Sequence, residues 1–230
     1  MPAPTERPQG RWADLTRRAV SALVMAPVAL ACVWLGGAAF AALVAAGLVG
    51  LVYEWLRLCR RSPSATFHAS GILYVLLAGG ALLWLRDDPL AGRANVLFLL
   101  LVVWAGDIGA YLIGRWIGGT RLAPGISPGK TWSGAVGGLV AASVVGLLAA
   151  GLLSDGAAGR AIPLAAVLGI VAQAGDLLES FVKRRLEVKD SGHLIPGHGG
   201  LFDRLDGVLA AAPVAALLAL TLGRGVVLWQ

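Results

Sequence analysis

The sequence predicts an all-α fold, a polytopic bundle of about seven transmembrane helices with its N-terminus in the cytoplasm. Hydrophobic residues make up 57% of the 230 residues and charged residues only 14%, whereas charged residues are roughly a quarter of a soluble domain. Apolar runs that can cross a bilayer, about 20 residues of helix each, recur along the chain. The distribution of the basic residues then indicates how these helices are oriented.

The predicted spans follow one another with short polar connections. A polar, basic tail covers residues 1–18, and an integral membrane domain covers residues 19–230. The spans are expected at residues 19–35, 38–56, 69–85, 95–113, 132–153, 161–182 and 207–229. The first apolar run has no small-residue cleavage site and leads straight into a second span, so it is interpreted as an uncleaved helix rather than a signal peptide.

The basic residues divide unequally between the two sides of this bundle. With the N-terminus inside, only Arg86, Arg93, Arg160 and Arg224 of the 19 Lys and Arg residues fall on the outer side. This distribution follows the positive-inside rule and predicts a multi-pass protein of the inner (plasma) membrane. The net charge of +6 is therefore assigned to orientation and to anionic lipid headgroups, and no nucleic acid partner is expected.

A polar stretch from Ser180 to Asp206 lies between the last two apolar runs and mixes basic residues, carboxylates, histidines and glycines. Cations at this density suit a polyphosphate, and neighbouring carboxylates suit a divalent metal that bridges phosphate oxygens. Basic residues after an apolar helix are also the usual cytoplasmic flank of a span. That alternative explains Lys183 to Arg185, but not the ordered acidic, His and Gly pattern that follows.

Acidic residues inside membrane spans are costly and indicate a functional site. Asp107, Asp176 and Glu179 lie towards the cytoplasmic ends of their predicted helices. On a helix, Asp176 and Glu179 share one face with Lys183, so an ion pair between Glu179 and Lys183 is an alternative to a functional role for that glutamate. Asp176 has no basic residue three or four positions away, which favours a divalent cation as its partner.

The connection at residues 114–134 is a second candidate for substrate binding. Ser127, Lys130 and Thr131 offer two hydroxyls and a positive charge just before a predicted helix. The N-terminus of a helix favours anions such as phosphate. Taken alone, this segment also fits an ordinary proline-rich turn.

Two blocks of the sequence, at residues 107–134 and 176–206, resemble the phosphatidate cytidylyltransferases. The second block carries the family-like signature in four parts: Ser180-x-Val182-Lys183-Arg184, Lys189-Asp190-x-Gly192, Pro196-x-His198-Gly199-Gly200 and Asp203-Arg204-x-Asp206. The first block contains Asp107-Ile108-Gly109-Ala110-Tyr111 and Ile126-Ser127-Pro128-x-Lys130-Thr131-Trp132. Ser133 stands where the family commonly has an acid.

The resemblance implies an integral membrane enzyme that joins CTP to phosphatidic acid on the cytoplasmic face, giving CDP-diacylglycerol and pyrophosphate. It implies Mg²⁺ as cofactor, with Mn²⁺ as a substitute, membrane lipids as surroundings, and leaves a homodimer open. The expected catalytic residues are Asp176, Lys189, Asp190 and Asp203, and the expected metal ligands come from Asp176, Asp203, Asp190 and Asp206. The expected substrate-binding residues are Ser127, Lys130, Thr131, Ser180, Lys183, Arg184, His198, Gly199, Gly200 and Arg204.

Two other functions would also account for parts of this pattern. A transporter also carries intramembrane acids, but its acids lie near the midplane and its halves form repeats. The acids of this chain gather at one face, and no inverted repeat is visible. A non-enzymatic assembly factor would not need the signature.

Overall fold

The computed structural model describes residues 24–60, 64–153, 158–192, 194–195 and 199–229. In this part of the chain, six helices are long and apolar enough to cross a membrane. They are α2 (Gly37–Cys59), α3 (Ala65–Arg86), α4 (Gly92–Ile117), α5 (Trp132–Leu153), α6 (Ala158–Arg185) and α7 (Phe202–Leu222). The helical fold class is confirmed, and these helices make the chain a membrane protein.

The predicted first span is only partly within the described residues. A shorter apolar helix, Val24–Leu35, precedes α2, and the tail at 1–18 with residues 19–23 lies outside the described part. Gly36 and Gly37 turn the chain between the two helices with φ values of +68° and +50°, a region that favours glycine. Arg86 holds the end of the short helix by donating from Nε to the carbonyl of Val33 at 2.7 Å.

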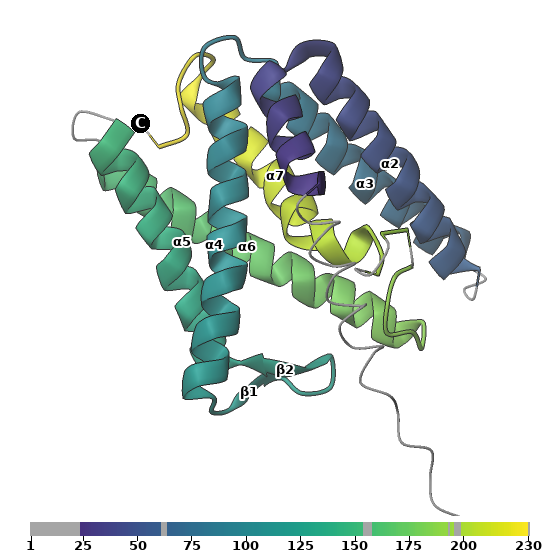
Figure 1. The fold of residues 1–230 in the computed structure, drawn as a ribbon. Coiled ribbons are helices and arrows are strands. Elements are labelled where there is room, and N and C mark those ends of the chain that lie inside the picture. The colour runs from purple at the N-terminus through teal and green to yellow at the C-terminus, as the bar shows by residue number, and fades with distance from the viewer. Residues whose placement is uncertain (1–23, 61–63, 154–157, 193, 196–198, 230) are drawn as a thin grey trace, which may run out of the picture.

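The helices pack in an order that differs from their order in the chain. The α5 helix contacts both α4 and α6, which also contact each other, α6 packs on α7, and α7 packs on α3, which contacts α2 (Figure 1). Small residues bring α4 and α5 together, because an added Cβ at Gly138 would meet the carbonyl of Gly106 at 2.7 Å. Such close approach is a common way for membrane helices to associate. Buried residues such as Leu99, Val102 and Leu168 fill the centre of the bundle.

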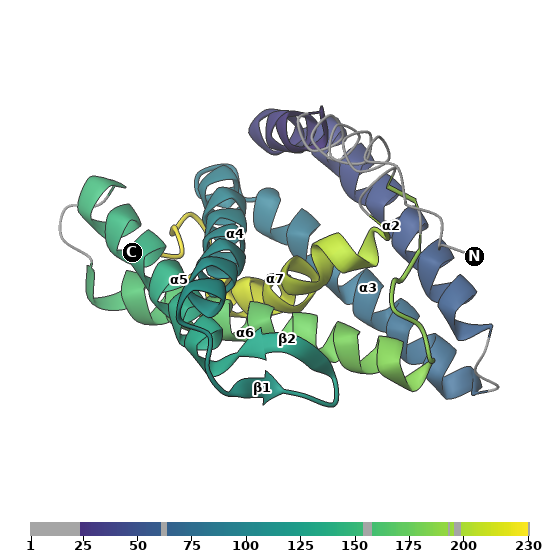
Figure 2. The ribbon, with the colours of Figure 1, turned by 60° about the horizontal axis from the view of Figure 1, so that its bottom comes forward.

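The connection between α4 and α5 contains a β-hairpin that the sequence analysis did not predict. Strand β1 (Arg121–Ala123) pairs antiparallel with β2 (Ser127–Thr131), with Arg121 opposite Thr131. The strands are too short and too rich in Gly and Pro for an alternating pattern to be visible. Figure 2 shows the hairpin beside α6, and Arg184 ties it there by donating from Nε to the carbonyl of Ile126 at 3.2 Å.

The predicted span at 207–229 was wrong in its bounds, because the last helix, α7, lies earlier in the chain. It begins at Phe202 and ends at Leu222, where Gly223 and Gly225 take φ values of +94° and +81°. The remaining residues fold back, because the backbone N–H of Gly225 donates to Asp88 at 2.6 Å and that of Leu228 donates to Asn95 at 2.7 Å. The apolar terminal segment therefore packs against the start of α4 instead of extending the helix.

Asp88 organises this end of the bundle from the turn between α3 and α4. Its carboxylate accepts hydrogen bonds from the backbone N–H groups of Leu90 and Ala91, both at 2.9 Å, as well as that of Gly225. These bonds, with Ala91 first, lower the pKa of Asp88 below its usual value because they favour the ionised form. The hairpin lies at the opposite end of the bundle (Figure 1).

Candidate active site

The two sequence blocks meet at the hairpin end of the bundle. Lys130, on β2, forms an ion pair with Asp176, on α6. The contact of Arg184 with Ile126 joins the same two segments. The structure thus brings together the two segments that the sequence analysis placed on one face, and it supplies Asp176 with a basic partner from another element.

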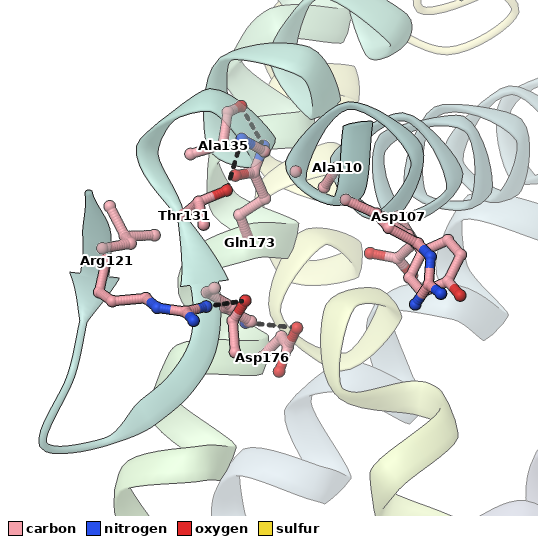
Figure 3. A pocket seen from close by; sticks show the side chains of 14 residues that line it. Asp107, Ala110, Arg121, Thr131, Ala135, Gln173 and Asp176 are labelled. Carbon is pink, nitrogen blue, oxygen red and sulfur yellow. Dashed lines mark hydrogen bonds and ion pairs between the residues drawn. The ribbon is translucent and has the colours of Figure 1, made fainter. Parts of the chain in front are cut away.

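A cavity of about 470 Å³ opens between α4, α5, α6 and the hairpin. Its polar lining combines three cations, Arg115, Arg121 and Lys130, with two carboxylates, Asp107 and Asp176. Figure 3 shows Arg121 reaching in from the hairpin, Asp176 from α6 and Asp107 from the opposite side. An excess of cations beside acidic groups suits a polyphosphate that binds together with a metal ion.

The start of α5 forms part of the cavity wall. Thr131 is buried, and its Oγ1 accepts a hydrogen bond from the N–H of Gly134 at 3.1 Å, as in an N-cap. Gln173, on α6, donates to the carbonyl of Ala135 at 3.2 Å and holds the same turn. Ser133 donates to the carbonyl of Gly118 and so closes the hairpin. The hydroxyl of Thr131 therefore helps to position the helix N-terminus that faces the cavity.

Three carboxylates converge between α6 and α7. Asp176, Glu179 and Asp206 each offer an oxygen, and these oxygens lie within 4.8 Å of one another. Glu179 is buried, and its Oε1 has no hydrogen-bond partner among the described residues. Three acidic groups at this spacing repel one another unless a proton or a cation intervenes. Hard oxygen ligands of this kind fit Mg²⁺ or Mn²⁺.

Asp203 has a different environment. It accepts hydrogen bonds from Lys183 Nζ at 2.7 Å, from Ser191 Oγ at 3.0 Å and from the N–H of Gly200 at 3.0 Å. Lys183 also lies 2.6 Å from Glu179, so the ion pair that the sequence left open as an alternative is present. Asp203, which we expected to share a metal with Asp176, is not a member of the three-carboxylate group.

A second cavity, of about 320 Å³, lies between α2, α3, α6 and α7. Its walls are mainly apolar and include Trp55, Phe67 and Phe202, whereas Glu179, Lys183 and Asp206 supply the charged side chains in its lining. Asp176 lines the first cavity, and the other two carboxylates of the group line the second. The carboxylate group therefore borders a polar cavity on one side and an apolar cavity on the other.

Other predicted site residues lie outside these two cavities. Lys189, Asp190 and Arg204 are exposed, and Ser127 and Ser180 are half-buried; none of the five lines either cavity as the structure describes them. Gly199 takes a φ of +84°, which favours glycine, and its carbonyl accepts a bond from Ile195 at 3.1 Å. His198 lies outside the described residues.

Some residues that were not assigned a role from sequence contribute to this region: Arg115, Arg121 and Gln173 line the polar cavity, and outside both cavities Ser191 donates to Asp203 and lies 3.3 Å from Glu54. For Glu54, the only signal in the sequence was an acidic residue near the end of an apolar run. Its partners, Ser191, Leu201 and Phe202, lie 137 to 148 positions further along the chain. A local sequence pattern cannot predict contacts between residues so far apart in the chain.

Comparisons with known proteins agree with the sequence resemblance. The sequence model described as "Cytidylyltransferase family" matches residues 61–222. A phosphatidate cytidylyltransferase of Brucella suis is 37% identical over 89% of this chain and 93% of its own length. One of Rickettsia bellii is 31% identical over 87% and 89%, and one of Haemophilus influenzae is 44% identical over 55% and 46%. The similarity thus extends well beyond the two blocks.

Proposed function

The chain belongs to the cytidylyltransferase family, and we propose that it transfers the cytidylyl group of CTP to phosphatidic acid, forming CDP-diacylglycerol and pyrophosphate. The observation that carries this proposal is the carboxylate group at the border of a polar and an apolar cavity. A nucleotide and a lipid need such different surroundings, and their reacting phosphates must meet between them.

The polar cavity is the proposed site for the triphosphate of CTP. Lys130, Arg121 and Arg115 can neutralise its charge, and the N-terminus of α5 faces the same space. Lys130 is paired with Asp176, so a phosphate that binds there competes with this carboxylate for the ammonium. The same cations can stabilise the negative charge of the bound triphosphate and then that of the pyrophosphate that leaves.

The apolar cavity is the proposed site for phosphatidic acid. Trp55, Phe67 and Phe202 offer apolar surface to the acyl chains, whereas Lys183 stands in the wall as the cation for the lipid phosphate. Two of the three carboxylates line the same cavity. Lys183 is already paired with Glu179 and Asp203, so a lipid phosphate that binds there would share its ammonium with these carboxylates.

The reaction needs positioning more than covalent help from the protein. An oxygen of the lipid phosphate forms a bond to the α-phosphorus of CTP while the bond from that phosphorus to the oxygen shared with the β-phosphate breaks. The displaced oxygen leaves as part of pyrophosphate. A phosphate monoester loses its second proton at a pKa of about 6, so the attacking oxygen is already ionised near neutral pH. The two cavities hold the reactants in line.

The carboxylates that fit a divalent cation are Asp176, Glu179 and Asp206. The unpartnered Oε1 of Glu179 and the mutual repulsion of the group support this assignment. Bound Mg²⁺, or Mn²⁺ in its place, would neutralise charge on the phosphate oxygens. Of the other metal ligands expected from sequence, Asp203 lies outside this group and accepts hydrogen bonds from Lys183 and Ser191, and Asp190 is exposed outside both cavities.

We place the site on the cytoplasmic face of the inner membrane, where CTP is present. The support is the distribution of basic residues, since the hairpin and the 180–206 stretch carry many of them at one end of the bundle. A homodimer stays a prediction, and the molecular mass of the detergent-solubilised protein tests it.

The experiment supplies purified protein with Mg²⁺, phosphatidic acid and CTP labelled at the α-phosphate. Label should pass into chloroform-extractable lipid, whereas CTP labelled at the γ-phosphate should give only labelled pyrophosphate. Diacylglycerol, which lacks the acceptor phosphate, should yield no labelled lipid, and EDTA should abolish the transfer. Absence of α-labelled lipid, or its formation from diacylglycerol, would refute the proposal.

A further inference from the structure

Glu54 is an acidic residue buried in the wall of the bundle. It lies near the cytoplasmic end proposed for α2 and is only 1% exposed. Its Oε1 accepts a hydrogen bond from the N–H of Leu201 at 2.9 Å, and its Oε2 accepts one from the N–H of Phe202 at 2.9 Å. Ser191 Oγ lies 3.3 Å from Oε2 as a third donor. The carboxylate therefore meets three donors, all from the stretch that leads into α7.

These bonds cap α7 from a different helix. The first N–H groups of a helix have no partner within it and carry partial positive charge. Leu201 stands at the N-cap position and makes no side-chain capping bond, so the carboxylate of Glu54 satisfies N–H groups at the start of this helix. Its position decides where the first turn of α7 lies relative to α2.

Two glycines of the signature fit closely around this carboxylate. A Cβ added at Gly192 would lie 2.6 Å from Oε1 of Glu54, and one added at Gly200 would lie 2.9 Å from Oε2. Gly192 has no φ value that requires glycine, so space is the reason for its lack of a side chain. The close fit shows that the carboxylate occupies a defined place in the loop.

We propose that Glu54 is a positioning residue, which holds the chain before α7 so that Asp203 and Asp206 stand correctly opposite α6. Ser191 is the link, because its hydroxyl lies within hydrogen-bond distance of both Glu54 and Asp203, at 3.3 and 3.0 Å. Glu54 itself lines neither of the two described cavities, so it acts on the reaction through α7. The part of this inference that concerns catalysis rests on the proposed function.

Amide hydrogen exchange tests the positioning without any substrate. In purified Glu54→Gln, peptides covering residues 199–206 should exchange about 10-fold faster or more, because an amide presents its own N–H groups to backbone donors. Peptides from α4 and α5 should exchange as in the wild type. The control is Asn95→Ala, which removes a buried contact at the opposite end of the bundle and should leave 199–206 unchanged. Wild-type exchange of 199–206 in Glu54→Gln would overturn the proposal.

The kinetic readout separates positioning from general loss of stability. Glu54→Gln should lower kcat by about 10-fold or more while KM for CTP stays within about twofold, since the polar cavity is built from other helices. Asn95→Ala should lower Tm with kcat unchanged. If Glu54→Gln and Asn95→Ala lower kcat equally at matched fractions of folded protein, Glu54 only stabilises the fold. That result would contradict the proposal.

A second variant decides the matter if Glu54→Gln does not fold. Gly192→Ala keeps the carboxylate but places a methyl group against it, so it should also raise the exchange of 199–206. In Gly192→Ala/Glu54→Ala the collision is absent, and the double variant should exchange no faster than Glu54→Ala alone. Unchanged exchange in Gly192→Ala would overturn the proposal. The exchange data stand even if no cytidylyl transfer is found.

Discussion

Lys183 on α6 and Asp203 on α7 form a hydrogen-bonded ion pair, with Nζ 2.7 Å from Oδ1. The same ammonium lies 2.6 Å from Glu179, and the side chains of Lys183 and Asp203 are each only 13% exposed. One cation thus joins two carboxylates on different helices. It also borders the apolar cavity in which we place the lipid.

Removing this cation should destabilise the protein as well as impair the reaction. Lys183→Gln leaves two poorly exposed carboxylates without their partner, which typically costs about 3 kcal/mol or more. The free energy of unfolding in detergent should fall by this order, and the KM for phosphatidic acid should rise. Arg185→Gln, an exposed cation at the end of the same helix, is the matched control and should change stability by less than about 0.5 kcal/mol.

The carboxylates should separate into two classes when each is changed to its amide. Asp176→Asn and Asp206→Asn should lose on the order of 10³-fold in rate and bind Mn²⁺ more weakly in electron paramagnetic resonance titrations. Asp203→Asn should also lose activity, but it should retain Mn²⁺ binding because Asp203 lies outside the three-carboxylate group. Glu187→Gln, exposed and outside the signature, should match the wild type. Loss of Mn²⁺ binding in Asp203→Asn would show instead that Asp203 is a metal ligand, as the sequence predicted.

The orientation can be tested by cysteine labelling in sealed membrane vesicles. Gly125→Cys, in the hairpin turn where an added Cβ meets no neighbour, and Glu187→Cys should both react with an impermeant maleimide from the cytoplasmic side only. The background variant lacks Cys32 and Cys59. Labelling of either position from outside would contradict the shared cytoplasmic site.

Asp88, at the end of the bundle opposite the proposed site, should make the stability of the fold depend on pH. Its pKa is lowered in the folded protein, chiefly by the bonds from Ala91 and Gly225, so the carboxylate stabilises the fold at pH above the unfolded value. That contribution should be lost as the pH falls below the ordinary value of 3.8 towards the folded pKa. Asp88→Asn should lower Tm at neutral pH, with the difference shrinking in acid. A difference that stays constant with pH would contradict this role.

The sequence by itself determined the helical membrane fold and the family, and it predicted several residues of the proposed site. Hydropathy identifies spans because a helix must satisfy its backbone groups internally in lipid. The pair of Glu179 and Lys183 was predictable because helix geometry places residues four apart on one face. Asp176 was visible as an acid inside an apolar helix, and Lys130 as a cation in a family-like block.

Only the tertiary structure decided which carboxylate of α7 joins Asp176. Asp203 and Asp206 are three residues apart, which is nearly one helical turn and about 4.5 Å of rise, so both face α6 from similar directions. The depth at which α7 packs beside α6 selects Asp206 for the carboxylate group and leaves Asp203 to Lys183. The contacts of Glu54 and the return of residues 223–229 also depend on packing between distant segments. Local sequence determines which groups share a helix face, whereas helix packing determines which faces meet.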